Sequence, residues 1–130
     1  MREPPLILAV DDEESFLEII STKLKSAGFQ VALAHNESEA IRESARLMPD
    51  LILMDIHLGG PSGTDAALAI KQNSKTKDLK IAFLSNLQEP WPGINSDKVG
   101  VAKTIGMEDF LDKTEDLNVL VEKIKGILRR

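Results

Sequence analysis

The stretch that decides the fold is Pro49-Asp50-Leu51-Ile52-Leu53-Met54-Asp55. Its run of large apolar residues, 51–54, is typical of a short strand that is buried on both faces. Such a strand lies centrally in a parallel sheet packed between helices, and Asp55 then emerges at the carboxyl end of the strand. Open α/β sheets bind their ligands at that end. Because Asp is also a common turn residue, Asp55 alone does not distinguish a functional site from a turn.

The composition favours a single globular domain spanning residues 1–130, with 42% apolar and 28% charged residues. Lys plus Arg number 16 against 21 Asp plus Glu, so the net charge of −5 lacks the basic footprint that nucleic acid or anionic lipid requires. The absence of cysteine excludes disulfides, thiol catalysis and thiolate metal sites. The apolar run at 6–10 is too short for a signal-peptide core or a membrane span. We therefore expect a soluble, cytoplasmic protein that binds neither nucleic acid nor membrane.

The segments on both sides of residues 49–55 alternate between strand and helix patterns. Strand patterns occupy 6–10, 29–33, 80–84 and 109–112, and helical periodicity occupies 14–27, 36–48, 64–73, 96–105 and 114–128. Together with the strand before Asp55, this makes five strands alternating with five helices. The pattern predicts an α/β fold: a doubly wound five-stranded parallel sheet with helices on both faces.

Local signals indicate how some of these helices begin, end and pack. Asn36, with Glu39 following, is typical of a capping pair at a helix start. Gly28 stands where a left-handed helix terminus is expected. Thr114 is predicted to cap the last helix, and Leu68 to face inward from the helix at 64–73.

Reactive side chains follow four of the five predicted strands. Asp11 and Asp12 follow the first strand, Asp55 the third, Ser85 the fourth and Lys113 the fifth. Asp11 and Asp12 could simply favour a helix N-terminus, but three carboxylates crowded at one sheet edge repel each other unless a cation offsets them. An all-oxygen acidic site suits Mg²⁺. With a lysine and a hydroxyl nearby, these are the groups needed to transfer a phosphoryl group onto an aspartate.

This combination of residues resembles the receiver domain of bacterial two-component response regulators. The matching pieces are Asp11-Asp12 behind an apolar strand, Asp55 after residues 50–54, Gly63, Ser85 after residues 82–84, and Asp109-Phe110-Leu111-Asp112-Lys113. The resemblance covers essentially the whole chain. It implies a flavodoxin-like receiver fold with strand order 2-1-3-4-5.

The resemblance also implies a metal site and a phosphoacceptor. Asp55 would accept the phosphoryl group from a histidine kinase or phosphotransfer protein. Asp12 and Asp55 would bind Mg²⁺ directly, the backbone carbonyl of His57 would complete the protein ligands, and Asp11 would act through water. Such a domain catalyses its own phosphorylation and dephosphorylation without being an enzyme in the usual sense.

Three further residues have roles implied by the same resemblance. Lys113 would contact the phosphoryl group, and Ser85 and Phe110 would form the switch pair. In that pair the hydroxyl moves toward the phosphate and the aromatic ring turns inward. The changed surface would then alter affinity for an unknown downstream protein, although Phe110 can equally be a plain core residue.

The chain departs from the family pattern near the expected site. Thr114 stands where family members usually carry Pro after the lysine, and Asn86 where they carry Ala or Gly. Gly59-Gly60 replaces the usual Pro after the phosphoacceptor. The segment 86–97 is longer than typical, and its Trp91 is either an anchor for a partner or a cover over the sheet edge.

Two other functions compete with a phosphorylated receiver. The chain could be a receiver-like protein-binding module that is never phosphorylated and acts through a fixed surface. It could also be an aspartate-nucleophile phosphatase on a similar sheet, which would carry a second Asp where this chain has His57. A flavin-binding module would need a Ser/Thr/Gly-rich phosphate loop where Asp11-Asp12-Glu13-Glu14 stands.

Overall fold

Five parallel strands form one sheet in the order β2-β1-β3-β4-β5. The strands are β1 (Leu6–Val10), β2 (Gln30–Ala34), β3 (Leu51–Asp55), β4 (Ile81–Ser85) and β5 (Asp109–Asp112). The strands β1, β3 and β4 are buried along their whole length, as expected for uninterrupted apolar runs in the middle of a parallel sheet. The predicted sheet and its strand order are both confirmed.

The structure, a computed structural model, describes residues 3–56, 63–85 and 109–129, with the backbone alone at 63–64 and 109–110. The predicted helix at 96–105 and the predicted features at His57, Gly59-Gly60, Asn86 and Trp91 lie outside these residues.

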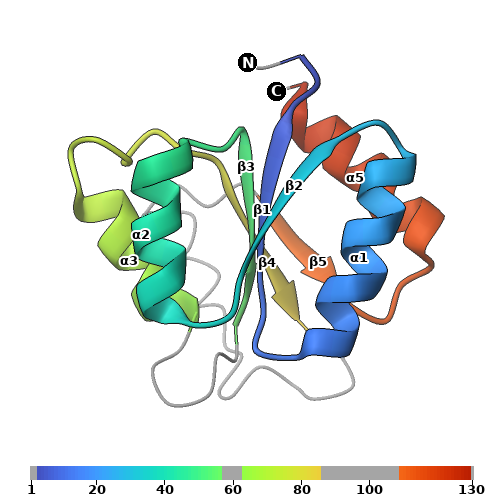
Figure 1. Ribbon diagram of the computed structural model, residues 1–130, viewed down its shortest axis with the longest axis horizontal. Coiled ribbons are helices and arrows are strands. Elements are labelled where there is room, and N and C mark those ends of the chain that lie inside the picture. The colour runs from blue at the N-terminus through green and yellow to red at the C-terminus, as the bar shows by residue number, and fades with distance from the viewer. Residues whose placement is uncertain (1–2, 57–62, 86–108, 130) are drawn as a thin grey trace.

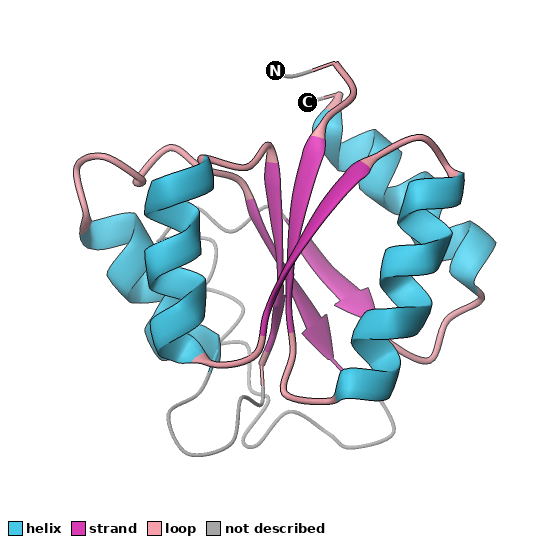
Figure 2. Ribbon diagram, in the orientation of Figure 1, coloured by secondary structure: helices cyan, strands magenta, loops and turns pink. Residues whose placement is uncertain are grey.

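Helices cover both faces of the sheet. They are α1 (Glu14–Ser26), α2 (Glu37–Leu47), α3 (Gly63–Gln72) and α5 (Leu117–Leu128). Figure 1 shows α1 and α5 on one side of the sheet and α2 and α3 on the other, and Figure 2 shows the resulting three layers. The doubly wound arrangement predicted from the alternating pattern is therefore present. In the part of the chain described here, no helix is long and apolar enough to cross a membrane.

Alternate residues of the central strands enter two separate hydrophobic cores. Ile7 and Leu53 belong to the core that includes residues of α1 and α5. Leu8 and Met54 belong to the core that includes residues of α2 and α3. Because neighbouring residues of a strand point to opposite faces, a strand buried on both faces must be apolar at every position.

The helix starts confirm one predicted cap and correct another. Asn36 Oδ1 accepts a hydrogen bond from the amide of Glu39 at 2.9 Å, as the capping pair predicts. The predicted cap at Thr114 is wrong. Asp116 is the N-cap of α5 and its carboxylate accepts from the amides of Asn118 and Val119. Thr114 instead donates to Asp112, which draws it back toward β5.

Two further local predictions have opposite outcomes. Gly28 has a φ of 98°, a conformation that L side chains rarely adopt, so the predicted helix terminus is confirmed. The prediction for Leu68 is wrong, because its side chain is 38% exposed while Ala67 and Ile70 are buried. The buried stripe of α3 runs through Ala66, Ala67 and Ile70, and Leu68 falls beside it.

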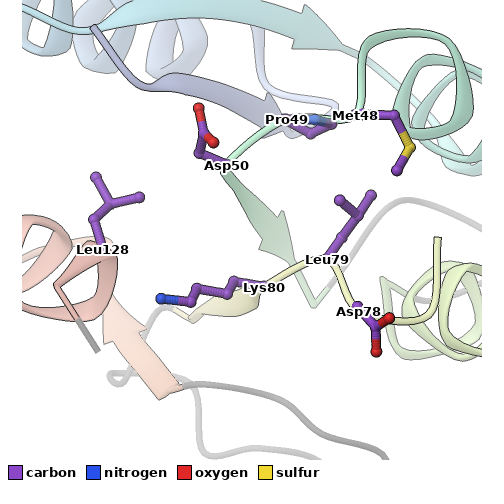
Figure 3. Close-up of a pocket in the computed structure, with 7 residues that line it drawn as sticks. All are labelled: Met48, Pro49, Asp50, Asp78, Leu79, Lys80 and Leu128. Atoms are coloured by element: carbon purple, nitrogen blue, oxygen red, sulfur yellow. The ribbon is translucent and has the colours of Figure 1, made fainter. Parts of the chain in front are cut away.

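A pocket of about 450 Å³ opens at the amino edge of the sheet, opposite to the edge where Asp55 lies (Figure 3). Its lining residues are Met48, Pro49, Asp50, Asp78, Leu79, Lys80 and Leu128. Two polar side chains of the lining form hydrogen bonds to the backbone of other elements. Asp50 accepts a hydrogen bond from the amide of Leu6 at 2.8 Å, and Lys80 Nζ donates to the carbonyl of Ile127 at 3.1 Å.

Candidate functional site

The carboxyl edge of the sheet brings together the side chains that the sequence places after its strands. Figure 2 shows the strands pointing toward the same edge. Backbone pairing sets their alignment: Asp55 lies opposite Leu84, and Ser85 opposite Asp112. The ladder also extends past β5, because the amide of Lys113 donates to the carbonyl of Ser85 at 2.9 Å. Residues far apart in the chain thus reach one small region.

Three carboxylates form a compact acidic cluster at this edge. Asp11, Asp12 and Asp55 each offer an oxygen, and these atoms all lie within 4.8 Å of one another. Asp11 is fully buried and Asp55 is 5% exposed, whereas Asp12 is exposed. Carboxylates this close repel each other unless a positive charge lies nearby. A nearby positive charge would therefore stabilise the cluster.

Backbone and side-chain contacts fix the position of Asp11. Its amide donates to the carbonyl of Ala34 at 3.1 Å, and its Oδ1 accepts from the amide of Glu13 at 2.9 Å. Its Oδ2 lies 2.7 Å from Lys113 Nζ as an ion pair. Among the described residues this buried oxygen has no hydrogen bond of suitable geometry. It consequently keeps capacity for a further electropositive partner.

Lys113 is the cation that pairs with the acidic cluster in the described part of the chain. Its ammonium lies 2.7 Å from Asp11 Oδ2 and 3.8 Å from Asp55 Oδ2. It also lies 4.7 Å from the ring centroid of Phe16, within the range of a cation–π interaction. Burial acts to lower the pKa of Lys113, but the contact with Asp11 and the negative charges of Asp55 and Glu13 outweigh burial and raise the pKa. The lysine is therefore charged at physiological pH.

The switch pair implied by the family resemblance is only partly described. Ser85 is the last residue of β4 and is 3% exposed, so it lies at the same edge as Asp55. The backbone of Phe110 pairs with Phe83 in the β4–β5 ladder. The side chain of Phe110 and the carbonyl of His57 lie outside the described residues.

The donor set at this edge is suited to a hard divalent cation. It consists of carboxylate oxygens, one of them buried without a hydrogen bond in the described residues, and the cluster contains no imidazole or sulfur. Oxygen-only sites bind Mg²⁺ or Ca²⁺ rather than Zn²⁺. The acidic cluster is thus able to hold a metal ion.

Two contacts of Lys113 and its neighbours were not predicted from the sequence. Phe16 belongs to the apolar stripe of α1, and nothing in its spacing indicates a lysine above its ring. Asp112 binds Thr114 through both the amide, at 2.8 Å, and the hydroxyl, at 2.6 Å. An Asp followed two residues later by Thr is a known local turn pattern, so the second contact had a detectable signal.

An ionic cluster of His35, Glu14 and Glu39 lies at the same edge of the sheet and was also missed. His35 follows β2 directly, and its two ring nitrogens lie 3.3 Å from Glu14 Oε2 and 3.1 Å from Glu39 Oε1. The hydrogen bond with Glu39 raises the pKa of His35 against the effect of burial, and the charge of Glu14 adds to it. The cluster links the first turn of α1 to the first turn of α2.

Comparisons with known proteins agree with this fold. Residues 7–125 match the response regulator receiver domain family. The phosphate regulon transcriptional regulatory protein PhoB of Pseudomonas aeruginosa is 33% identical over 124 residues, which cover 95% of this chain and 52% of that protein. The CAI-1 autoinducer sensor kinase/phosphatase CqsS of Vibrio cholerae is 32% identical over 95% of this chain and 17% of that protein.

Solved structures show the same similarity. The chemotaxis protein CheY4 of Vibrio cholerae superimposes with a TM-score of 0.82 at 25% identity, covering 95% of this chain and 98% of that one. The chain spans about half the length of the first curated relatives it matches. The match extends over nearly all of its residues and includes the acidic edge of the sheet. The chain belongs to the response regulator receiver domain family of two-component systems.

Proposed function

We propose that residues 1–130 form a phosphorylatable receiver domain in which Asp55 accepts a phosphoryl group from a histidine kinase or phosphotransfer protein. The surroundings of Asp55 carry this proposal: the residue is 5% exposed, belongs to a carboxylate cluster within 4.8 Å, and lies 3.8 Å from Lys113 Nζ. Asp55 lies at the end of a central strand, next to the ammonium of Lys113 and within a cluster able to hold a metal ion. These are the surroundings that phosphoryl transfer requires.

In this proposal one oxygen of Asp55 attacks the phosphorus of the donor. A bond forms between that oxygen and phosphorus, while the bond from phosphorus to the donor breaks and the donor keeps its electron pair. Asp12 and Asp55 would hold Mg²⁺ directly, with the carbonyl of His57, and Asp11 would reach the ion through water. The metal, when bound, neutralises charge on the phosphoryl oxygens.

Lys113 and Ser85 would then respond to the new acyl phosphate. The ammonium of Lys113 would contact a phosphoryl oxygen, and the hydroxyl of Ser85 would donate to another. With Phe110 as the aromatic partner of Ser85, this movement would shift the domain between two surface states of different affinity for a downstream protein. What supports this scheme is that Ser85 ends β4, the strand next to β3 in the sheet, and that Lys113 Nζ lies 3.8 Å from Asp55 Oδ2.

Intact-mass measurement after incubation with acetyl phosphate tests the proposal. Wild type should gain one phosphoryl group with Mg²⁺ present and none with EDTA. The variant Asp55→Asn should gain none, because an amide is not a nucleophile toward phosphorus. Asp78→Ala, which removes an exposed carboxylate at the opposite edge of the sheet, should behave as wild type. If wild type stays unmodified with acetyl phosphate and with a crude kinase preparation, the module that works without phosphorylation becomes the better account.

A further inference from the structure

We infer that Asp112 and Thr114 form a clamp that positions Lys113. The inference rests on the proposed function, because its measured consequence is weaker binding of a phosphoryl group or its mimic. Asp112 and Thr114 act through Lys113 in this account. They are positioning residues and touch no phosphoryl group themselves.

The clamp consists of two hydrogen bonds to a single carboxylate oxygen. Asp112 Oδ1 accepts from the amide of Thr114 at 2.8 Å and from its hydroxyl at 2.6 Å. Both contacts span the residue between them, so they close a tight turn around Lys113. The carbonyl of Asp112 also accepts from the amide of Glu115 at 3.2 Å. Asp112 therefore holds both residues that follow the lysine.

The backbone of Lys113 is consequently held from two directions. On the strand side, its amide donates to the carbonyl of Ser85 at 2.9 Å, which continues the β4–β5 ladder. On the loop side, the clamp fixes the residue that follows. A proline at that position would restrict φ through its ring. Thr114 has no such restriction, and its two hydrogen bonds to Asp112 supply the restraint instead.

A fixed backbone matters here because the lysine side chain is long and its charged end must reach a defined point. The ammonium lies 2.7 Å from Asp11 Oδ2 and 4.7 Å from the ring centroid of Phe16. A lysine stem has several rotatable bonds, and holding it in one geometry costs conformational entropy. A restrained backbone removes the additional conformational freedom of the turn, which would otherwise also be lost when the phosphoryl group binds.

Beryllofluoride, a phosphoryl mimic, provides the test. Its affinity is measured at saturating Mg²⁺ in wild type, Thr114→Val and Thr114→Ser. Valine keeps the branched shape and the amide but removes the hydroxyl, and serine restores the hydroxyl. We expect Thr114→Val to weaken the mimic about three- to tenfold, less than the full effect of a hydrogen bond to a charged group because only part of the loss reaches the mimic through Lys113, and Thr114→Ser to restore binding. Mg²⁺ affinity should be no lower than in wild type, because Thr114 contacts no member of the acidic cluster in the hydrogen bonds above.

A second comparison separates positioning from general destabilisation. In a Lys113→Ala background, Thr114→Val should have no further effect on mimic affinity, because the clamp acts only through the lysine. Thr22→Val, the same change at an exposed threonine of α1, should leave affinity at the wild-type value.

Each outcome decides the inference. The clamp would be overturned if Thr114→Val left mimic affinity unchanged or lowered Mg²⁺ affinity in parallel. It would also be overturned if Thr114→Val lowered mimic affinity equally with and without Lys113. Failure of wild type itself to bind the mimic would instead refute the proposed function, and is seen before any variant is compared.

Discussion

At the scale of single residues, the described part of the site balances three carboxylates against one ammonium. Lys113 lies 2.7 Å from Asp11 Oδ2 and 3.8 Å from Asp55 Oδ2, and its pKa is raised by these partners despite burial. One positive charge offsets only part of the repulsion among Asp11, Asp12 and Asp55. A divalent cation would neutralise the remaining negative charge. Two substitutions test this, one by removing a carboxylate and one by removing the ammonium.

The first substitution is Asp12→Ala. It removes an exposed member of the cluster, so repulsion falls and the thermal stability measured in EDTA should equal or exceed that of wild type. Mg²⁺ binding, measured by titration calorimetry, and phosphorylation should both be lost. Unchanged Mg²⁺ affinity would refute the assignment of Asp12 as a ligand. Asp78→Ala serves as the control, because it removes an exposed Asp from the other edge.

The second substitution is Lys113→Ala, which removes the ammonium and leaves Asp11 buried without its ion pair. Denaturant unfolding in EDTA should show a loss of about 1–3 kcal/mol, the cost of leaving a buried polar group without its partner. Added Mg²⁺ should restore more stability than it adds to wild type, and its affinity should stay equal or increase. A variant that Mg²⁺ stabilises no more than wild type would contradict this electrostatic account.

At the scale of secondary-structure elements, His35 connects two helix starts. Its ring lies between Glu14 in the first turn of α1 and Glu39 in the first turn of α2. The hydrogen bond with Glu39 raises the pKa of His35 above 6.5, and the same contact lowers the pKa of Glu39 below 4.5. Both groups are exposed enough that solvent screens much of this interaction.

These opposite pKa shifts predict a pH window for the contact. Because the pKa of His35 is raised in the folded state, its contact adds stability that is fully present below pH 6.5. This stability is lost as the pH rises through the folded-state pKa of His35. The lowered pKa of Glu39 adds stability that is lost as pH falls below 4.5. The melting temperature of wild type minus that of His35→Gln should therefore be largest between these limits and decline toward pH 8. A difference that is constant over this range, or an NMR pKa for His35 below 6.5, would contradict the prediction.

The start of α5 gives a second prediction at this scale. Asp116 accepts hydrogen bonds from the amides of Asn118 and Val119, so Asp116→Ala should lower the free energy of unfolding by about 1 kcal/mol. Thr114→Val should cost less, because Thr114 is bonded to Asp112 and not to the helix. Denaturant unfolding of both variants measures this. A larger loss of unfolding free energy in Thr114→Val than in Asp116→Ala would indicate that Thr114 is the cap after all.

At the scale of the whole molecule, the features that the sequence predicts correctly are those that depend on local spacing or on burial. The apolar runs of β1, β3 and β4 predict central strands, and the residues directly after them predict which side chains share the carboxyl edge. The cap at Asn36 follows from its spacing to Glu39. Each of these features is encoded within a few neighbouring residues.

Contacts between sequence-distant side chains could not be predicted in the same way. The ion pair of Lys113 with Asp11 and the ring of Phe16 near the ammonium depend on how α1 packs against the sheet and α5. The error at Leu68 has a similar origin, since the buried stripe of α3 depends on the angle at which the helix lies on the sheet. The cap at α5 was misplaced because Asp112 competes for Thr114.

The central claim is that Asp55 becomes the phosphorylated residue, and one measurement tests it directly. Phosphorylated protein is treated with borohydride, which reduces an acyl phosphate to an alcohol, and the modified residue is located by peptide mass spectrometry. The account predicts reduction at Asp55 alone, dependent on Mg²⁺ during phosphorylation. Reduction at Asp11 or Asp12, or a phosphoryl group that resists borohydride because it is carried by a serine, threonine or histidine, would contradict it.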